Sequence, residues 1–121
     1  MTTNTTFNTI FIPSILKDIP YSIGKNAEHN SEIISLSSSN DLWFHLDNSP
    51  SAHVILHIPD GILLNKKNKH KIVVQGAVLC KANSSKKSDK NVSVCYAFIK
   101  NVHLTDIPGQ VTLSEKKTII I

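Results

Sequence analysis

The sequence contains no arginine, so lysine supplies all 13 of its permanently basic side chains. A lysine ammonium is a point charge, whereas the bidentate fork that reads guanine edges needs a guanidinium group. The absence of that group excludes readout of base sequence by arginine forks. We expect any nucleic-acid binding by this chain to be directed at the phosphate backbone and to discriminate poorly between base sequences.

Cysteine and long apolar runs are also scarce. The two cysteines, Cys80 and Cys95, are too few for a disulfide framework and lie among apolar neighbours, which predicts buried thiols in a reducing compartment. No apolar run approaches the roughly 18 residues of a membrane-spanning helix, and residues 1–6 lack the basic and apolar parts of a secretory signal. We therefore predict a cytoplasmic protein with no membrane partner.

Length and composition predict one globular domain. The chain has 121 residues, of which 40% are hydrophobic and 18% are charged, values typical of a folded soluble protein. Residues 1–6 are polar and are expected to form a flexible N-terminus. The single domain is then expected to cover residues 7–121.

The net charge of +4 is distributed unevenly along the chain. Residues 65–100 contain nine lysines and a single acidic residue, whereas the other residues contain four lysines and eight acidic residues. A domain with this asymmetry attracts a polyanion through one side. The alternative is a lysine-rich face that only keeps the protein in solution.

Apolar patterns predict an α+β fold of order ββαββαβββ, with two helices and a largely antiparallel or mixed sheet. Alternation at 41–46 and 52–58 predicts an antiparallel strand pair with one buried face. Residues 72–82 fit a helix or a strand, whereas 92–99 predict a central strand. Pro20 favours a sheet edge or a strand start for its segment. The other expected elements are strands at 7–12, 19–23, 110–113 and 117–121, a helix at 27–36 that Asn26 caps, and an irregular segment at 100–108.

No group of residues has the spacing of a catalytic or metal centre. His53 and His57 share one face of a predicted strand but would lie about 13 Å apart, too far for one ion, and His45 lies across the hairpin. Ser51 and Asp47 flank His53 in sequence, but a catalytic triad also needs an oxyanion hole. We predict no enzyme activity, no cofactor and no metal ion, and structural histidines are the favoured interpretation.

Two strings, DLWFH at Asp41–His45 and SAHV at Ser51–Val54, resemble the core of the NFACT-R domain. That domain lies at the C-terminus of ribosome-associated quality-control proteins of the NEMF/RqcH class and also occurs alone. Further strings match in the same order, and the resemblance covers residues 7–121, as in a standalone form of the domain. These strings are Gly24–Asn26 (GKN), Lys81–Ser84, Val94–Phe98, Lys100–Val102 (KNV), Pro108–Val111 (PGQV) and Lys117–Ile121.

The resemblance implies that residues 72–82 form a helix and that the domain binds RNA, with tRNA and the ribosome as its setting. It marks the matched positions as candidate contacts, although His53 is equally suited to pin the hairpin loop as a structural residue. Where the family carries arginines near its second helix, this chain has lysines. The predicted nucleic-acid-binding residues are Lys25, Asn26, His53, Lys81, Lys86, Lys87, Lys90 and Lys100.

These observations predict a non-catalytic RNA-binding module that contacts the phosphates of tRNA or rRNA, with the ribosome as a further partner. Two alternatives stay open. The first is DNA binding by the same lysine-rich face. The second is a protein-interaction adaptor whose exposed sheet edges dock a ribosomal or coiled-coil partner.

Overall fold

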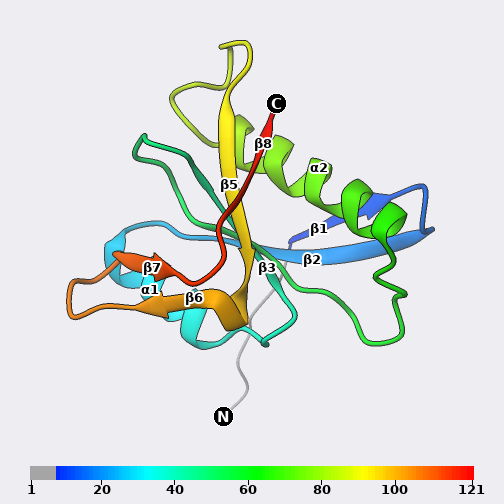
Figure 1. Cartoon of the computed structure of the whole chain (residues 1–121), viewed down its shortest axis with the longest axis horizontal. Coiled ribbons are helices and arrows are strands. Elements are labelled where there is room, and N and C mark those ends of the chain that lie inside the picture. The colour runs from blue at the N-terminus through cyan, green and yellow to red at the C-terminus, as the bar shows by residue number, and fades with distance from the viewer. Residues whose placement is uncertain (1–7) are drawn as a thin grey trace.

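A computed structural model describes residues 8–121 as a six-stranded sheet with one helix on each side and a separate two-stranded sheet (Figure 1). The predicted flexible segment 1–6 lies outside the described residues. The helices are α1 (Ala27–Ser35) and α2 (Lys66–Ala82), with a single 3₁₀ turn η1 (Ile99–Asn101). The strands are β1 (Asn8–Ile12), β2 (Lys17–Ile23), β3 (Leu42–Leu46), β4 (Val54–Leu56), β5 (Ser93–Phe98), β6 (Val102–Leu104), β7 (Val111–Leu113) and β8 (Lys117–Ile120).

The large sheet has the strand order β1-β2-β4-β3-β5-β8, and all of its neighbouring strands are antiparallel. The smaller sheet pairs β6 with β7. The predicted α+β fold with two helices is confirmed, and so is the central position of the strand at 92–99, which lies between β3 and β8. The structure adds β6, which falls in the segment predicted to be irregular. His103 and Leu104 of this short strand are exposed, so it carries no alternating apolar pattern.

Helix α2 covers one face of the large sheet (Figure 1). The fully buried ring of Phe44 from β3 lies against Gly76 of α2, where an added Cβ would come within 2.2 Å of the ring. The absence of a side chain at Gly76 lets the helix approach the strand closely. The helix predicted over 72–82 is confirmed, but it begins earlier, at Lys66, because the side chain of Asn65 accepts a hydrogen bond from the N–H of Asn68.

Helix α1 and the β6–β7 sheet lie against the opposite face, where Trp43 and Ile55 are buried at 2% and 0% exposure. The prediction that the β3–β4 pair has one buried face is therefore wrong. Alternation along the two strands identified which side chains share a face, but the second face is covered by segments distant in sequence. The two cysteines are free and buried, as predicted.

The prediction that Pro20 marks a sheet edge or a strand start is also wrong, since it lies inside β2, between β1 and β4. Its carbonyl accepts a hydrogen bond of 2.8 Å from the N–H of His57, just beyond the last residue of β4. The nitrogen of Pro20 points the same way, toward His57, and has no hydrogen to donate in return. The regular pairing of β2 with β4 ends at Tyr21 and Leu56, so the missing N–H affects only the end of this ladder.

Candidate nucleic-acid interface

Three segments that are distant in sequence meet beside the end of β3 and line one groove: residues 24–27, 45–53 and 108–111. We call it the histidine groove because His45 and His53 lie at its centre. It consists of two adjoining hollows of about 510 and 370 Å³. Both hollows are lined by His45, Pro50, His53 and Gly109. The GKN, DLWFH, SAHV and PGQV strings thus contribute to one surface.

Three aromatic rings form one wall of the histidine groove. The indole N–H of Trp43 donates a hydrogen bond of 3.0 Å to Nδ1 of His53. The ring of His45 is stacked parallel to Trp43, with 5.9 Å between centroids, and meets His53 edge-on at 4.9 Å. Since Nδ1 of His53 accepts a hydrogen bond, the neutral ring carries its hydrogen on Nε2. The contacts fix all three rings relative to one another.

The environment of His53 keeps it uncharged at neutral pH. Burial, followed by the neighbouring His45, lowers the pKa of His53 to about 4, although the backbone of Gly109 acts in the opposite direction. Only 4% of the residue is exposed. Of the two roles open to His53, these facts favour the structural one, because a buried neutral ring offers no charge to a phosphate.

The N-terminus of α1 forms the rim of the histidine groove. The side-chain oxygen of Asn26 accepts a hydrogen bond of 2.8 Å from the N–H of His29, so the predicted cap is confirmed. The N–H of Gly109 donates to Ser31 Oγ at 2.8 Å, which ties the 108–111 turn to the helix. Lys25 precedes the cap and is exposed, so its ammonium is available at the rim.

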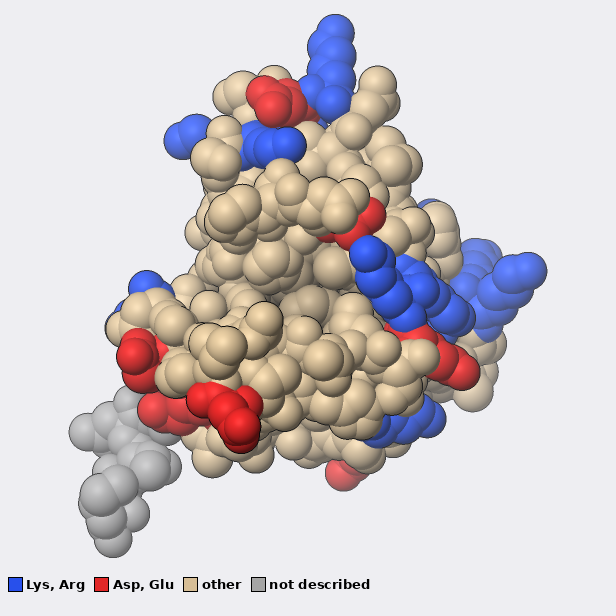
Figure 2. Space-filling model, turned by 60° about the vertical axis from the view of Figure 1, so that its left-hand side comes forward, with Lys and Arg blue, Asp and Glu red and all other residues tan. Residues whose placement is uncertain are grey.

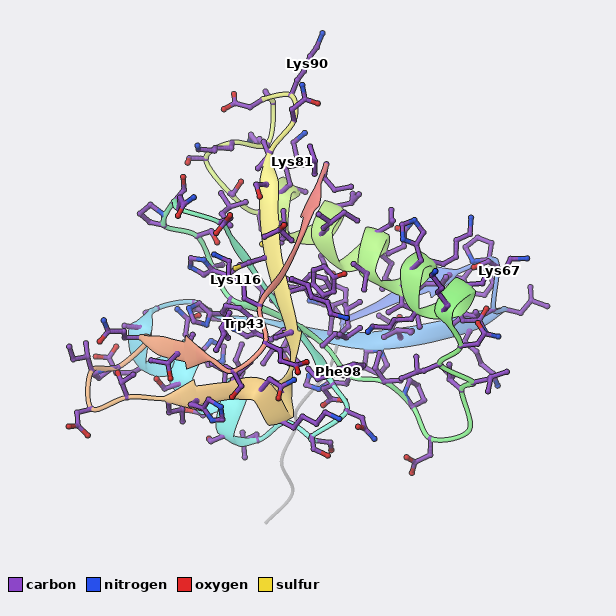
Figure 3. All side chains as sticks on the ribbon, viewed as in Figure 1. Trp43, Lys67, Lys81, Lys90, Phe98 and Lys116 are labelled. Carbon is purple, nitrogen blue, oxygen red and sulfur yellow. The ribbon has the colours of Figure 1, made fainter. Side chains whose placement is uncertain are left out.

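Four of the other predicted contacts lie elsewhere, at the C-terminal end of α2. Lys81 is in its last turn, and Lys86, Lys87 and Lys90 follow in the loop before β5; we call these four the upper lysine group. Lys90 stands at the tip of this loop, whereas Lys67 lies at the opposite end of the helix (Figure 3). We call the lysines of that end the lower lysine group: Lys66, Lys67, Lys69 and Lys71. Figure 2 shows basic side chains at the top of the molecule and, apart from these, on its right-hand side, with further basic side chains at the left and at the lower right.

The structure therefore brings Lys25, Asn26 and His53 together, but not with the upper lysine group. Lys100, in η1, belongs to neither set and lies beside Lys69 at a separate pocket. The set predicted from sequence missed two lysines of the last strand region. Lys116 forms an ion pair of 2.6 Å with Asp47 at the histidine groove, and Lys117 lines the pocket that holds Lys100; both fall outside the basic segment 65–100.

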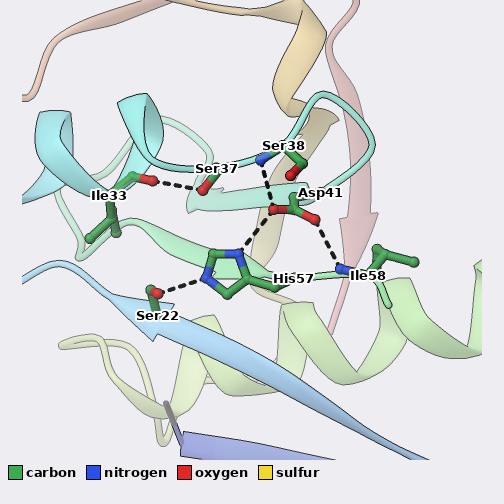
Figure 4. A network of polar contacts seen from close by, with 7 residues as sticks. All are labelled: Ser22, Ile33, Ser37, Ser38, Asp41, His57 and Ile58. Carbon is green, nitrogen blue, oxygen red and sulfur yellow. Dashed lines mark hydrogen bonds and ion pairs between the residues drawn. The ribbon is translucent and has the colours of Figure 1, made fainter. Parts of the chain in front are cut away.

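A polar network joins β2, β4 and the loop before β3 (Figure 4). Ser22 Oγ lies 2.7 Å from Nε2 of His57, whose Nδ1 lies 3.0 Å from Asp41 Oδ2. Asp41 also accepts hydrogen bonds from the N–H groups of Ser38 and Ile58, at 3.0 and 2.9 Å. Burial acts to raise the pKa of Asp41, but these hydrogen bonds and His57 outweigh it and hold the pKa below its usual value. The charged carboxylate thus fixes the ends of β3 and β4.

The residues considered above as a triad have separate partners. Ser51 Oγ accepts a hydrogen bond from the N–H of Leu46, His53 accepts one from Trp43, and Asp47 is paired with Lys116. Within residues 8–121, the structure assembles no group of three or more histidine, cysteine or acidic side chains that could hold a metal ion. Over the same range, none of the helices has the length and apolar character needed to cross a membrane.

These features define a small α+β domain with its lysines and its groove at the ends of a covered sheet. A family model described as the NFACT protein RNA binding domain matches residues 11–114. Because this match spans most of the chain, the chain belongs to that family. The membership confirms the resemblance that the DLWFH and SAHV strings indicate.

The chain is also similar to individual proteins. Coiled-coil domain-containing protein 25 of Danio rerio is 29% identical over 117 aligned residues, which cover 92% of this chain and 56% of the relative. The protein of the same name from Mus musculus is 32% identical, with 92% and 55% covered. The chain thus spans about half the length of these relatives. The C-terminal part of the fibronectin/fibrinogen-binding protein from Streptococcus suis shares the fold, with a TM-score of 0.75 at 22% identity, over 99% of this chain and 46% of that one.

Proposed function

We propose that this domain is a non-catalytic RNA-binding module that contacts phosphates through the upper and lower lysine groups. The separation of the two groups carries this proposal. Residues 72–80 of α2 contain no charged side chain, and Lys67 and Lys81 are about 21 Å apart along the helix axis. About six stacked nucleotides of one strand are needed to cover that distance. One short run of phosphates cannot occupy both groups.

Three observations support RNA and its backbone as the ligand. Membership in an RNA-binding domain family favours RNA over DNA. The absence of arginine removes bidentate base contacts, so lysine–phosphate pairs supply the attraction. The exposed Lys25 adds positive charge at the rim of the histidine groove, beside the N-terminus of α1, where the helix dipole also favours an anion.

We further propose a cytoplasmic setting in which the RNA is tRNA or rRNA and the ribosome is the larger partner. The resemblance of the chain to domains of ribosome-associated quality-control proteins supports this setting. In this setting, the domain binds RNA and catalyses no reaction, because the buried His53 and the paired Asp41 stabilise the packing of the domain. Ordered contacts of this kind hold the groove and the helix ends at fixed positions.

Salt-dependent binding of labelled tRNA, measured by fluorescence anisotropy, tests the proposal. If about five lysines neutralise phosphates, the slope of log affinity against log salt should lie between roughly −3.5 and −4.5. Lys67→Gln and Lys87→Gln, one from each lysine group, should each reduce the steepness of that slope by about 0.7 to 0.9. Ser35→Glu on α1 is the matched control, since it also lowers the net charge by one but lies on the other side of the sheet.

The three variants separate the possible outcomes. Reduced slopes for both lysine variants, with an unchanged slope for Ser35→Glu, support binding through both ends of α2. Slopes of both lysine variants equal to that of the parent overturn the proposal, because neither lysine would then neutralise a phosphate. An equal reduction in all three variants also overturns it, because a general charge effect would then explain the binding. A DNA duplex of matched length serves as competitor, and its displacement of tRNA at equal concentration would favour the DNA-binding alternative.

A further inference from the structure

A pocket separate from the histidine groove lies beside Phe98, at the lower end of β5 in Figure 3. Three lysines from three different elements line it: Lys69 of α2, Lys100 of η1 and Lys117 of β8. We call it the Phe98 pocket. Its volume is about 210 Å³, which corresponds to on the order of seven water molecules. A phosphate group with part of its sugar fits this volume.

The ring of Phe98 holds two of the three ammonium groups. Nζ of Lys69 lies 4.8 Å from the ring centroid, and Nζ of Lys100 lies 5.4 Å from it. Cation–π attraction of this kind keeps lysine head groups over an aromatic face. Burial, followed by the charge of the neighbouring Lys117, lowers the pKa of Lys69. Positive charges are therefore gathered here against their mutual repulsion.

The charge of the Phe98 pocket matches one class of anion. Its three lysines are opposed by a single acidic side chain, Glu115, which leaves two positive charges without a carboxylate of their own in the lining. An internal phosphodiester carries one negative charge. A phosphate monoester carries about −1.5 to −2 at pH 7 and offers three acceptor oxygens. The monoester is the better match in charge and in number of acceptors.

On the basis of the proposed function, we infer that the Phe98 pocket binds the terminal phosphate monoester of an RNA strand. Lys69, Lys100 and Lys117 each donate to one of its oxygens. The remainder of the strand leaves along the same end of α2, where Lys66 and Lys67 meet its internal phosphates. The domain then anchors an RNA end, in addition to holding the backbone.

Two RNA oligonucleotides of one sequence test this inference, one with a terminal phosphate and one with a terminal hydroxyl. Separate pairs with the phosphate at the 5′ and at the 3′ end identify which end is bound, and the dye is placed at the opposite end. The parent should bind the phosphorylated strand more tightly by roughly tenfold, as expected for a few partly exposed ion pairs. Lys117→Gln should reduce this ratio to near one. Glu115→Gln should increase it.

Lys87→Gln is the matched control, because it removes the same charge from the upper lysine group and should weaken both strands while it preserves their ratio. Thermal unfolding by circular dichroism checks that Lys117→Gln is folded, which we expect because the substitution relieves repulsion. A ratio of one in the parent for both ends, with both strands bound, overturns the inference and leaves the proposed function standing. If neither strand binds, the inference and the proposed function both fail.

Discussion

Acidification from pH 7 to pH 5 should destabilise the folded domain through His53. Its pKa is about 4 in the folded state, because of burial and the neighbouring His45, against 6.5 for an unperturbed histidine. At pH 5 the unfolded chain therefore carries a proton on this side chain and the folded domain does not. As the pH decreases, the free energy of unfolding falls over the range in which the unfolded state binds more protons than the folded state. The loss begins near pH 6.5 and continues down to about pH 4.

The size of the effect follows from the difference between the two pKa values. The full difference between 6.5 and about 4 corresponds to about 3 kcal/mol, and the part between pH 7 and pH 5 to about 2 kcal/mol. At pH 7 the side chain is neutral in both states and contributes almost nothing to this term. Urea unfolding at pH 7, 6 and 5 measures it, with the fluorescence of the single tryptophan, Trp43, as the signal.

His53→Asn isolates this contribution from that of the other histidines. The asparagine Oδ1 stands near the place of Nδ1 and accepts the hydrogen bond from the Trp43 indole, but the amide does not titrate. We expect the variant to be less stable than the parent at pH 7 and to lose about 2 kcal/mol less between pH 7 and pH 5. If both proteins lose equal stability over this range, the pKa of His53 is not depressed and the reasoning is refuted.

Three further predictions follow from buried groups and from the upper lysine group. Gly76→Ala should lower the free energy of unfolding by about 1–3 kcal/mol in a urea titration, since the methyl group meets Phe44 and the clash outweighs the gain in helix propensity; greater stability would contradict this packing. Burial raises the pKa of Cys80 from 9.0 to about 11, so its reaction with a disulfide reagent at pH 8 should be at least about a hundredfold slower in the native state than in urea. Replacement of both Lys86 and Lys87 by Glu should weaken the binding of all RNA sequences alike, as seen in anisotropy titrations, and loss for one sequence alone would argue against backbone contact.

Much of the fold was predictable because its elements have local signals. Asn26 and Asn65 both precede helices and cap them, but only Asn26 was recognised, since the segment that follows Asn65 is rich in lysine and lacks an apolar stripe. Strand alternation placed Trp43 and Phe44 on opposite faces correctly. It did not reveal that the Trp43 face is covered, because the covering residues of α1 and β6 are far away in sequence.

The candidate site was less predictable, because it consists of residues that are close in space but distant in sequence. Sequence grouped the lysines of 65–100 into one basic side, whereas α2 carries them to two ends about 21 Å apart. Lys117 lies outside that segment, but the pairing of β8 with β5 brings it to Phe98 and Lys100. No local sequence pattern predicts that Lys117 lies near Phe98 and Lys100. The sequence indicated the histidine groove only through short strings that match the family. The folded structure was needed to show that these strings line one groove.

The coverage of both sheet faces determines how such a domain can engage RNA. Many RNA-binding sheets present aromatic side chains on an open face and stack bases on them. Here Tyr96 packs against the core beneath α2, and Trp43 is buried beneath α1 and the small sheet, so neither offers an open stacking face. Under the proposed function, binding is left to loops, helix ends and pockets at the rim of the sheet, where the exposed cations are lysines. We expect such a surface to recognise the charge and spacing of phosphates, and to gain selectivity from the shape and the ends of the RNA rather than from its bases.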